Sequence, residues 1–381
     1  MSEWKEYQLK ELTSKIGSGS TPKGGGNSYK DEGISLIRSQ NILDYKFSIN
    51  GLAYIDEVQA NVLKNVSVEE HDILLNITGD SVARCCNAPK EFLPARVNQH
   101  VAIIRSNIKL LDNNFLKYSL IDSKEELLSL SEIGGTRNAL TKGMLENFVI
   151  KLPSLPEQKA IASVLSALDN KIDLLHRQNK TLESMAETLF RQWFVEEAQD
   201  DWNEVRLGQL FSICSGKGLK RDEFIELGMY PVLGANGEIG RCNKSLYSER
   251  LIYTGRVGTL GNIFIIHENE KVWLSDNTLI FKDIKYFYFV YFQLKMINFD
   301  EYNVGSTQPL IRQSDIKEIY IDFPNDLVLL DLFERDVEII FTKINNNIQK
   351  IQTLENLRDT LLPKLMSGEV RVNYTPEEIK Q

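Results

Sequence analysis

The sequence predicts an α+β protein in which two mixed, β-rich globular domains alternate with two long helices that pair as an antiparallel intramolecular coiled coil. Two observations predict this fold class. The chain repeats itself: a Trp-x-Glu-x-x-Leu-x-x-Leu opening at residues 4–12 returns at 202–210, and residues 134–153 return at 305–324. Each repeat also ends in a segment whose apolar residues recur at alternating intervals of four and three, which is the spacing of a coiled-coil seam.

The repeats divide the chain into five parts. We expect a first globular domain over residues 1–152, a first helix over 153–198, a second globular domain over 199–323, a second helix over 324–368 and a tail over 369–381. Prolines at the end of each globular domain favour a boundary there, because proline is tolerated at a helix start and not inside the helix.

Short apolar or alternating runs between glycine and asparagine breakers predict strands in both domains. In the first domain these runs are residues 34–37, 72–77 and 101–104, and a helical spacing follows over 115–130. In the second domain they are residues 251–253, 263–266 and 278–281, and a helix follows over 286–296. The aromatic residues of this last helix could stack on bases, but their helical spacing favours a place in the domain core.

The two helices are predicted over about residues 157–196 and 325–366, with one register related by an offset of 172. Ala186 and Arg358 occupy equivalent positions in the two seams. The other seam residues are Ile161, Leu165, Leu168, Ile172, Leu175, Asn179, Leu182, Leu189 and Trp193 in the first helix, and Phe333, Val337, Ile340, Ile344, Asn347, Ile351, Leu354, Leu361 and Leu365 in the second.

The polar seam positions select an antiparallel alignment. Asn179 and Asn347 are not equivalent in the repeat, yet one antiparallel register places them in the same layer. A buried polar layer costs some stability and selects one alignment. The alternative is that each asparagine is an isolated, locally tolerated polar residue.

Composition indicates an ordinary globular protein. The chain has 381 residues, of which 42% are hydrophobic and 25% charged, and no stretch approaches the ~18 apolar residues of a membrane span. The N-terminal residues lack the basic and apolar pattern of a secretory signal. The four cysteines show no paired spacing, and we therefore expect a reduced, cytoplasmic protein that does not contact a membrane.

The formal net charge of −9 at first disfavours nucleic acid as a partner. However, residues 1–152 carry 18 basic and 19 acidic side chains, and residues 202–323 carry 14 and 15, so both domains are close to neutral. A basic face can therefore exist on each domain. Attraction to phosphate by this chain alone should be weak, and a partner would have to supply part of the positive field.

The sequence contains no motif of an enzyme active site. It lacks the Gly-x-x-x-x-Gly-Lys-Ser/Thr phosphate loop, a Gly-x-Gly-x-x-Gly dinucleotide motif and the Asn/Asp-Pro-Pro-Tyr/Phe signature of base-amino methyltransferases. The four histidines are scattered and fit no metal cluster. We expect no catalytic residues, no metal site and no cofactor bound by this chain.

The chain resembles the specificity (S) subunit of type I restriction–modification enzymes over nearly its whole length. The resemblance rests on the order and duplication of four features. They are the paired openings at 4–12 and 202–210; the Thr21-Pro22 and Gly79-Asp80 loops; the Gly134-Gly135-Thr136 and Gly305-Ser306-Thr307-Gln308 segments; and the ends at 152–158 and 361–368. The second helix departs from the pattern, because Pro324-Asn325-Asp326-Leu327 replaces the Leu-Pro-Glu-Gln-Lys run of the first.

The resemblance implies that each globular domain is a target recognition domain that reads one half of a split site in double-stranded DNA. It implies that the helices set the spacer and dock two methyltransferase (M) subunits, and that restriction (R) subunits join this core. S-adenosylmethionine, ATP and Mg²⁺ are then expected on the partner subunits. A non-DNA scaffold that clamps protein partners with the same coiled coil and globules is the alternative.

Base-edge readers should be polar or basic residues on loops, because these make paired donor and acceptor contacts. Each candidate could also be an ordinary polar turn residue. The candidates are Lys23, Arg38, Gln40, Asn41, Arg84, Asn98, Gln99, Arg137 and Asn138 in the first domain, and Lys217, Lys220, Arg221, Asn236, Arg256, Asn262, Asn277 and Gln308 in the second.

Overall fold

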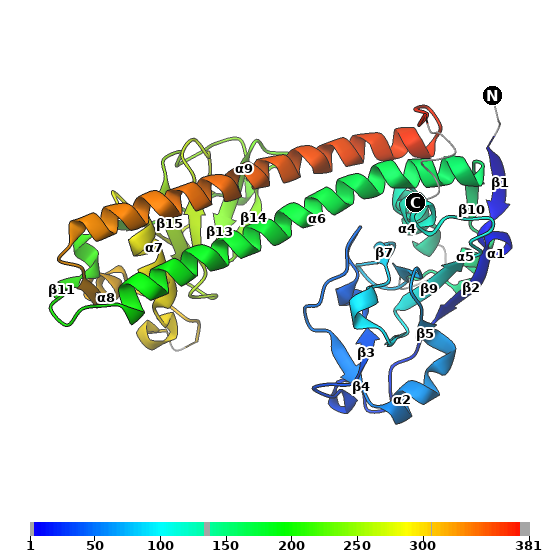
Figure 1. The fold of residues 1–381 in the computed structure, drawn as a ribbon, viewed down its shortest axis with the longest axis horizontal. Helices are drawn as coiled ribbons and strands as arrows, with labels where there is room; N and C mark the ends of the chain where they lie inside the picture. The colour runs from blue at the N-terminus through cyan, green and yellow to red at the C-terminus, as the bar shows by residue number, and fades with distance from the viewer. Residues whose placement is uncertain (1–3, 133–137, 306, 374–381) are drawn as a thin grey trace. The chain divides into compact units, whose positions relative to one another are not determined.

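The computed structural model describes residues 4–132, 138–305 and 307–373. The chain divides into two compact units, the first built from residues 1–175 and 349–381 and the second from residues 176–348. Each unit holds one globular domain and the adjoining parts of both long helices (Figure 1).

The first unit contains three sheets within the described residues, with strand orders β2-β9-β6-β7, β4-β3-β8-β5 and β1-β10. Its strands are β1 Lys5–Gln8, β2 Thr13–Ser18, β3 Ile34–Ile37, β4 Ala53–Ile55, β5 Ser67–Val68, β6 Ile73–Asn76, β7 Cys85–Asn87, β8 Ala95–Val97, β9 Val101–Ser106 and β10 Val149–Leu152. Its shorter helices are α1 Leu9–Leu12, α2 Glu57–Val62, α3 Asn113–Asp122, α4 Lys124–Glu132 and α5 Lys142–Asn147.

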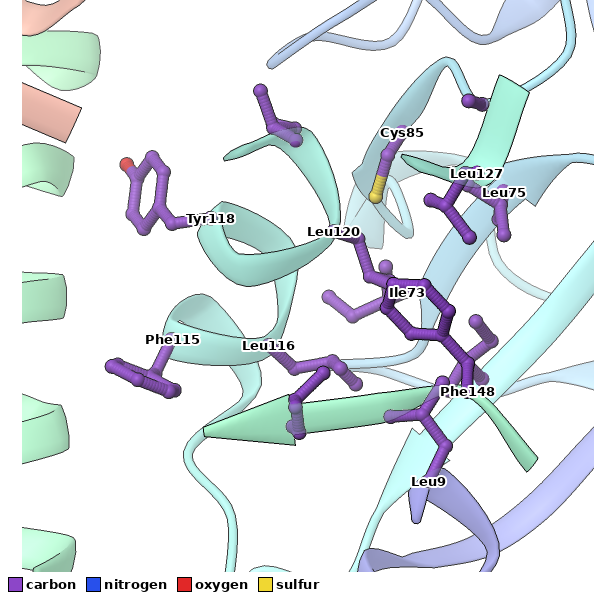
Figure 2. Close-up of a cluster of buried hydrophobic side chains, with 14 of the residues drawn as sticks. Leu9, Ile73, Leu75, Cys85, Phe115, Leu116, Tyr118, Leu120, Leu127 and Phe148 are labelled. Atoms are coloured by element: carbon purple, nitrogen blue, oxygen red, sulfur yellow. The ribbon is translucent and has the colours of Figure 1, made fainter. Parts of the chain in front are cut away.

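The central strands of the first domain are apolar on both faces because two cores cover them. Ile73 and Leu75 of β6 face one core, which also contains Leu9 of α1 and Phe148. Figure 2 shows this cluster around Phe115, Leu116 and Leu120 of α3. Leu74 of β6 faces the second core. Alternation along a strand therefore explains why the sequence shows a continuous apolar run rather than a polar and apolar pattern.

The helix predicted over residues 115–130 is wrong in one respect, since the structure has two helices there. Asp112 caps α3 by accepting a hydrogen bond from the backbone of Phe115 at 2.9 Å. Ser123 ends α3 by leaving the helical conformation. The carbonyl of Ser123 then accepts a hydrogen bond from the backbone N–H of Leu127, and this hydrogen bond begins α4.

Cys85 and Cys86 occupy β7 and point into the two different cores. Burial raises the pKa of both thiols, that of Cys86 to about 12. All four cysteines are free thiols in the described chain. The adjacent pair is thus part of the packing and carries no thiolate at neutral pH.

The second unit repeats this plan. Its four-stranded sheet has the order β12-β18-β15-β16, with a three-stranded sheet β14-β13-β17 and a pair β11-β19 beside it. The strands are β11 Asn203–Arg206, β12 Ser212–Ser215, β13 Tyr230–Gly234, β14 Gly237–Cys242, β15 Leu251–Gly255, β16 Ile263–Ile266, β17 Trp273–Leu274, β18 Thr278–Lys282 and β19 Tyr320–Phe323. The shorter helices are α7 Phe287–Met296 and α8 Gln313–Lys317.

The aromatic residues of α7 form the core of the second domain, as their spacing predicts. Phe289 is fully buried and its ring meets that of Phe194 at 5.0 Å between centroids. Phe292 stacks on Phe190 at 5.2 Å. These side chains are not available to stack on bases.

Two long helices form the antiparallel coiled coil. They are α6 Leu155–Arg191, which continues as a π-helical turn over Gln192–Glu196, and α9 Leu327–Met366. In the first unit Ile172 and Leu175 of α6 pack against Ile351 and partly buried Leu354 of α9. In the second unit Trp193, in the π-helical turn that follows α6, contacts Phe333 of α9. The chain directions are opposite in both units, and Figure 1 shows the two helices side by side.

The buried face of these helices is broader than the predicted narrow seam. Phe341 lies outside the seam register, yet it is buried against the ring of Tyr288 at 4.7 Å between centroids. Leu362 is likewise buried in the core of the first domain beside Leu365. Each globular domain packs onto the helices, so their ends have the wide apolar stripe of an ordinary globular helix.

A polar layer interrupts the apolar seam in the second unit. The side-chain amide of Asn347 donates to the side-chain oxygen of Asn179 at 2.8 Å and to Gln178 Oε1 at 3.0 Å. Asn347 is fully buried and Asn179 is 8% exposed. The two asparagines are thus partners in the layer that the predicted register assigns to them, and not isolated polar residues.

Charged residues join the first domain to the helices. Asp169 of α6 accepts from Lys117 Nζ at 3.1 Å, from the Tyr118 hydroxyl at 2.6 Å and from Arg358 Nη1 at 3.2 Å. Figure 2 shows the Tyr118 hydroxyl directed out of the apolar cluster. The Arg358 guanidinium lies 3.5 Å from the ring centre of Tyr45. Buried cations on both sides of one carboxylate hold α3, α6 and α9 together.

Candidate nucleic-acid interface

Strand ends converge at one edge of the first domain. Ser18 at the end of β2 pairs with Ala102, and Asn76 at the end of β6 pairs with Val101, so β2 and β6 both end where β9 begins. Strands β3 and β8 run parallel and end together. We define loop cluster 1 as the loop residues beyond these ends, 19–24, 38–41, 77–84 and 98–100, together with 138–139.

Backbone hydrogen bonds connect the loops of this cluster. Gly19 N donates to Asn98 O at 3.1 Å, and Asn98 N donates to Ile37 O at 3.0 Å. Gly79 N donates to Asn138 O at 3.2 Å. A Cβ atom on Gly19 would overlap the carbonyl oxygen of Val97. Only glycine therefore allows the chain after β2 to approach the end of β8 this closely.

The second domain builds the same edge. Gly216 N donates to Thr278 O at 3.2 Å, and Ser275 N donates to Leu233 O at 2.9 Å. The bridge between Val257 and Leu310 repeats the bridge between Thr78 and Ala139 in the first domain. We define loop cluster 2 as the described residues of 216–218, 235–236, 256–262, 275–277 and 307–310.

Loop cluster 1 brings together six of the candidate readers as exposed or half-buried side chains. Arg38 is held over the ring of Tyr29 at 5.2 Å and donates to the carbonyl of Gly51. Gln99 accepts from the Thr21 hydroxyl and bonds to the ring of His100 at 2.9 Å. The six residues are Lys23, Arg38, Gln40, Arg84, Gln99 and Asn138.

Two candidates in this domain are buried in turns rather than exposed on the loops. Asn41 is fully buried, and its amide donates to Ser48 O at 2.9 Å and to Asn50 O at 3.2 Å. Asn98 is 5% exposed, and its side-chain oxygen accepts from His100 N at 3.0 Å. Both amides complete the hydrogen bonding of buried turns, which leaves no surface for a base edge. Arg137 lies outside the described residues.

Loop cluster 2 collects six further candidates. The amide of Asn262 donates to the side-chain oxygen of Asn236 at 2.7 Å. Arg256 Nη1 donates to Ser215 Oγ at 2.6 Å. The six residues are Lys217, Asn236, Arg256, Asn262, Asn277 and Gln308.

Lys220 and Arg221 are not brought into loop cluster 2. Their segment crosses the three-stranded sheet, because Leu219 and Phe224 pack against Val232 and its neighbours there. Beyond them Ile225 N donates to Arg241 O at 2.9 Å, which ties the segment to β14. The apolar residues on either side thus hold this segment, with Lys220 and Arg221, against the three-stranded sheet.

Sequence reasoning missed several residues that shape the clusters. Ser215 binds both Arg256 and Gln313 in the second domain. Thr21 and His100 orient Gln99 in the first. The available signal was position, since Ser215 directly precedes the repeated glycine Gly216 just as Ser18 precedes Gly19.

The charge of each cluster is weakly positive in its described residues. Loop cluster 1 contains Lys23, Arg38 and Arg84 against Asp80. Loop cluster 2 contains Lys217 and Arg256 against Asp276. The clusters therefore offer polar donors and acceptors on a nearly neutral surface rather than a strongly basic groove.

Over residues 4–132, 138–305 and 307–373, no three His, Cys, Asp or Glu side chains group as metal ligands. No helix in the same residues combines the length and apolar character needed to cross a bilayer.

Comparisons with known proteins agree with this architecture. Two segments, residues 1–184 and 199–357, match the family model described as type I restriction modification DNA specificity domain. The chain is 26% identical to the type I restriction enzyme MjaIX specificity subunit of Methanocaldococcus jannaschii, over 97% of this chain and 94% of that protein. It is 26% identical to a putative type I specificity subunit of Mycoplasma genitalium, over 67% of this chain and 71% of that protein.

A solved structure has the same fold. The chain aligns with the crystal structure of a type I restriction–modification system S subunit from M. genitalium with a TM-score of 0.60 and 19% identity. The alignment covers 98% of this chain and 97% of that one. The two segments of the family match fall on the two repeats, each with its globular domain and helix.

Proposed function

Because the chain belongs to the type I restriction–modification DNA specificity family, we propose that it is the subunit that selects the DNA sequence for a methyltransferase complex. Each globular domain reads one half of a bipartite site in double-stranded DNA. The observation that carries this proposal is the pair of loop clusters. The same strand ends support both clusters, yet the side chains they present differ, as two unlike half-sites require.

The partners follow from what the chain lacks. The loop clusters carry little net positive charge, so tight DNA binding needs a second source of phosphate contacts. We propose that two M subunits bind the duplicated chain, supply those contacts and carry S-adenosylmethionine. R subunits with ATP and Mg²⁺ complete the complex. In this arrangement the chain itself contributes recognition and no catalysis.

The test is a map of modified adenines in the genome of a host that expresses the chain together with its M subunits. The expected result is one motif split into two parts by a spacer of fixed length, absent from the same host without the chain. A continuous motif, or no motif, would contradict the proposal.

A binding measurement separates this function from a protein scaffold. With M subunits present, random duplex DNA should bind in low salt and release as salt rises, because phosphate contacts displace counterions. A scaffold that clamps only proteins adds no DNA binding, and no salt dependence, beyond what the M subunits show without the chain.

A further inference from the structure

Arg256 has a backbone fixed on both sides. It follows directly after β15, in loop cluster 2. Its N–H donates to Asn277 O at 2.9 Å, and its carbonyl accepts from Ile311 N at 3.0 Å. Two neighbouring loops therefore hold the backbone of Arg256 at the edge of the domain.

The guanidinium is fixed as well. Nη1 of Arg256 donates to Ser215 Oγ at 2.6 Å, and Nε2 of Gln313 donates to the same oxygen at 2.9 Å. Ser215 ends β12 and Gln313 begins α8. A hydroxyl oxygen has two acceptor positions, so these two donors use both and leave the guanidinium little freedom to rotate.

No carboxylate compensates this charge in the described chain. Ion pairs join three arginines of the second domain to acids, Arg206 to Glu318, Arg241 to Glu238 and Arg250 to Glu338. Within the described residues no ion pair joins Arg256 to an acid, as is also true of Arg221 and Arg312. Its Nε is buried and finds no acceptor among the described residues. A half-buried cation without a carboxylate partner lowers stability, and such exceptions concentrate at functional sites.

The free donors match one base. A guanidinium has five N–H groups. One is taken by Ser215 and the buried Nε–H is enclosed, which leaves three on the two Nη atoms. In the major groove guanine presents two acceptors, O6 and N7. Adenine presents one acceptor and one donor, cytosine presents a donor, and thymine presents one acceptor beside a methyl group. Two Nη donors side by side therefore fit guanine and misfit the others.

From these observations we infer that Arg256 is a specificity-determining residue that reads one guanine in the half-site of the second domain. Ser215 and Gln313 are positioning residues that aim its guanidinium. This inference rests on the proposed function and adds to it one base, one reader and the two groups that orient the reader.

The experiment expresses full-length variants with the M subunits in a host that lacks its own copy of the chain, and maps modified adenines. The unaltered chain should give a split motif with guanine at a fixed place in one half. Arg256→Gln should admit other bases at that place only, with the preference for guanine falling roughly 5- to 150-fold. Arg221→Gln, a matched exposed arginine of the same domain, should leave the motif unchanged.

Variants of Ser215 test the positioning role. Ser215→Ala should relax the motif at the same place by a smaller factor, and Ser215→Thr, which keeps the hydroxyl, should restore it. In each case, if the half of the motif read by the first domain stays intact, the chain is folded and assembled. A role confined to domain stability would reduce modification evenly and would not be specific to one base.

The outcomes separate the inference from the function on which it rests. A missing split motif with the unaltered chain overturns the proposed function. A split motif that Arg256→Gln leaves unchanged, or relaxes in both halves, overturns the inference alone. If Arg256→Gln abolishes modification, Arg256→Lys decides, because it keeps the charge without the two-pronged geometry. If the motif of Arg256→Lys is relaxed only at the guanine, the inference is supported. If that variant gives an unchanged motif or no motif, the inference is overturned.

Discussion

The side-chain amide of Asn347 donates a 2.8 Å hydrogen bond to Asn179, and these two residues form a buried polar layer in an apolar seam. The layer is not symmetric within the repeat. The position equivalent to Asn347 in the first helix is Leu175, and that leucine packs against Ile351. Amide therefore meets amide in only one alignment of the two helices, and every shifted register buries an amide against a hydrocarbon side chain.

Replacing Asn347 with leucine should lower the free energy of unfolding by about 1–3 kcal/mol, because the Asn179 amide loses its buried partner. The double variant Asn179→Leu, Asn347→Leu should recover most of that loss, since both polar groups are then gone. Urea unfolding followed by helical circular dichroism measures both. Asn346→Leu, at an exposed neighbouring position, is the control. A double variant as unstable as the single one would contradict this account.

Asp169→Asn should lower the free energy of unfolding by about 3–5 kcal/mol. The change removes the negative charge at position 169. The positive charges of Lys117 and Arg358 remain, on side chains that are only 6% and 10% exposed. Asp359→Asn is a matched control, because Asp359 also bonds to Arg358 but is 58% exposed. The control should cost at most about 1 kcal/mol. Equal losses in the two variants would show that burial is not the decisive factor.

Gly19→Ala should destabilise the first domain by about 1–3 kcal/mol or more, because its Cβ would collide with backbone that cannot move aside. Gly17→Ala, in strand β2 just before Gly19, places its Cβ in open space and should be nearly neutral. Thermal unfolding of the two variants gives the comparison. In modification mapping, Gly19→Ala should blur only one half of the motif. A Gly19→Ala protein as stable as Gly17→Ala would refute the close approach.

His267 should make the stability of the second domain depend on pH. Burial lowers the pKa of its imidazole below the ordinary 6.5, and Arg250 lowers it further, against the raising effect of Glu270. Below pH 6.5 the unfolded chain binds a proton that the folded chain refuses, so stability falls as pH drops; above pH 6.5 the full contribution is present. Unfolding by urea at about pH 7.5 and about pH 5.5 should show a smaller decrease for His267→Gln than for the unaltered chain. Equal decreases would contradict the prediction.

The helical pairing was predictable because the register of a coiled coil follows from the spacing of residues within each helix. The interval between apolar residues and the place of two asparagines determine which residues meet, whatever the rest of the chain does. The extra buried residues were not predictable in the same way. Phe341 is buried because Tyr288 of another element covers it, and that contact depends on how the domain packs on the helix.

The candidate site was predictable in its location and less so in its members. Gly-rich loops and polar residues at strand ends pointed to the edge of each domain where the structure gathers most of the described candidates, because loops leave a sheet where its strands end. Asn41 shows the limit of this reasoning. Asparagine is common in exposed loops and in turns that consume its amide internally, and only the hydrogen-bond partners distinguish the two. Ser215 was missed because its role depends on Gln313, 98 positions away.

The last turns of α9 have a consequence for how the protein is made. Leu362, Leu365 and Met366 share one core with Leu9 and Leu12 near the start of the chain. The first domain therefore leaves the ribosome before the α9 residues that complete its core have been made. A nascent chain that stalls before that point exposes apolar surface to chaperones and proteases, so quality control can remove half-made subunits before they meet DNA.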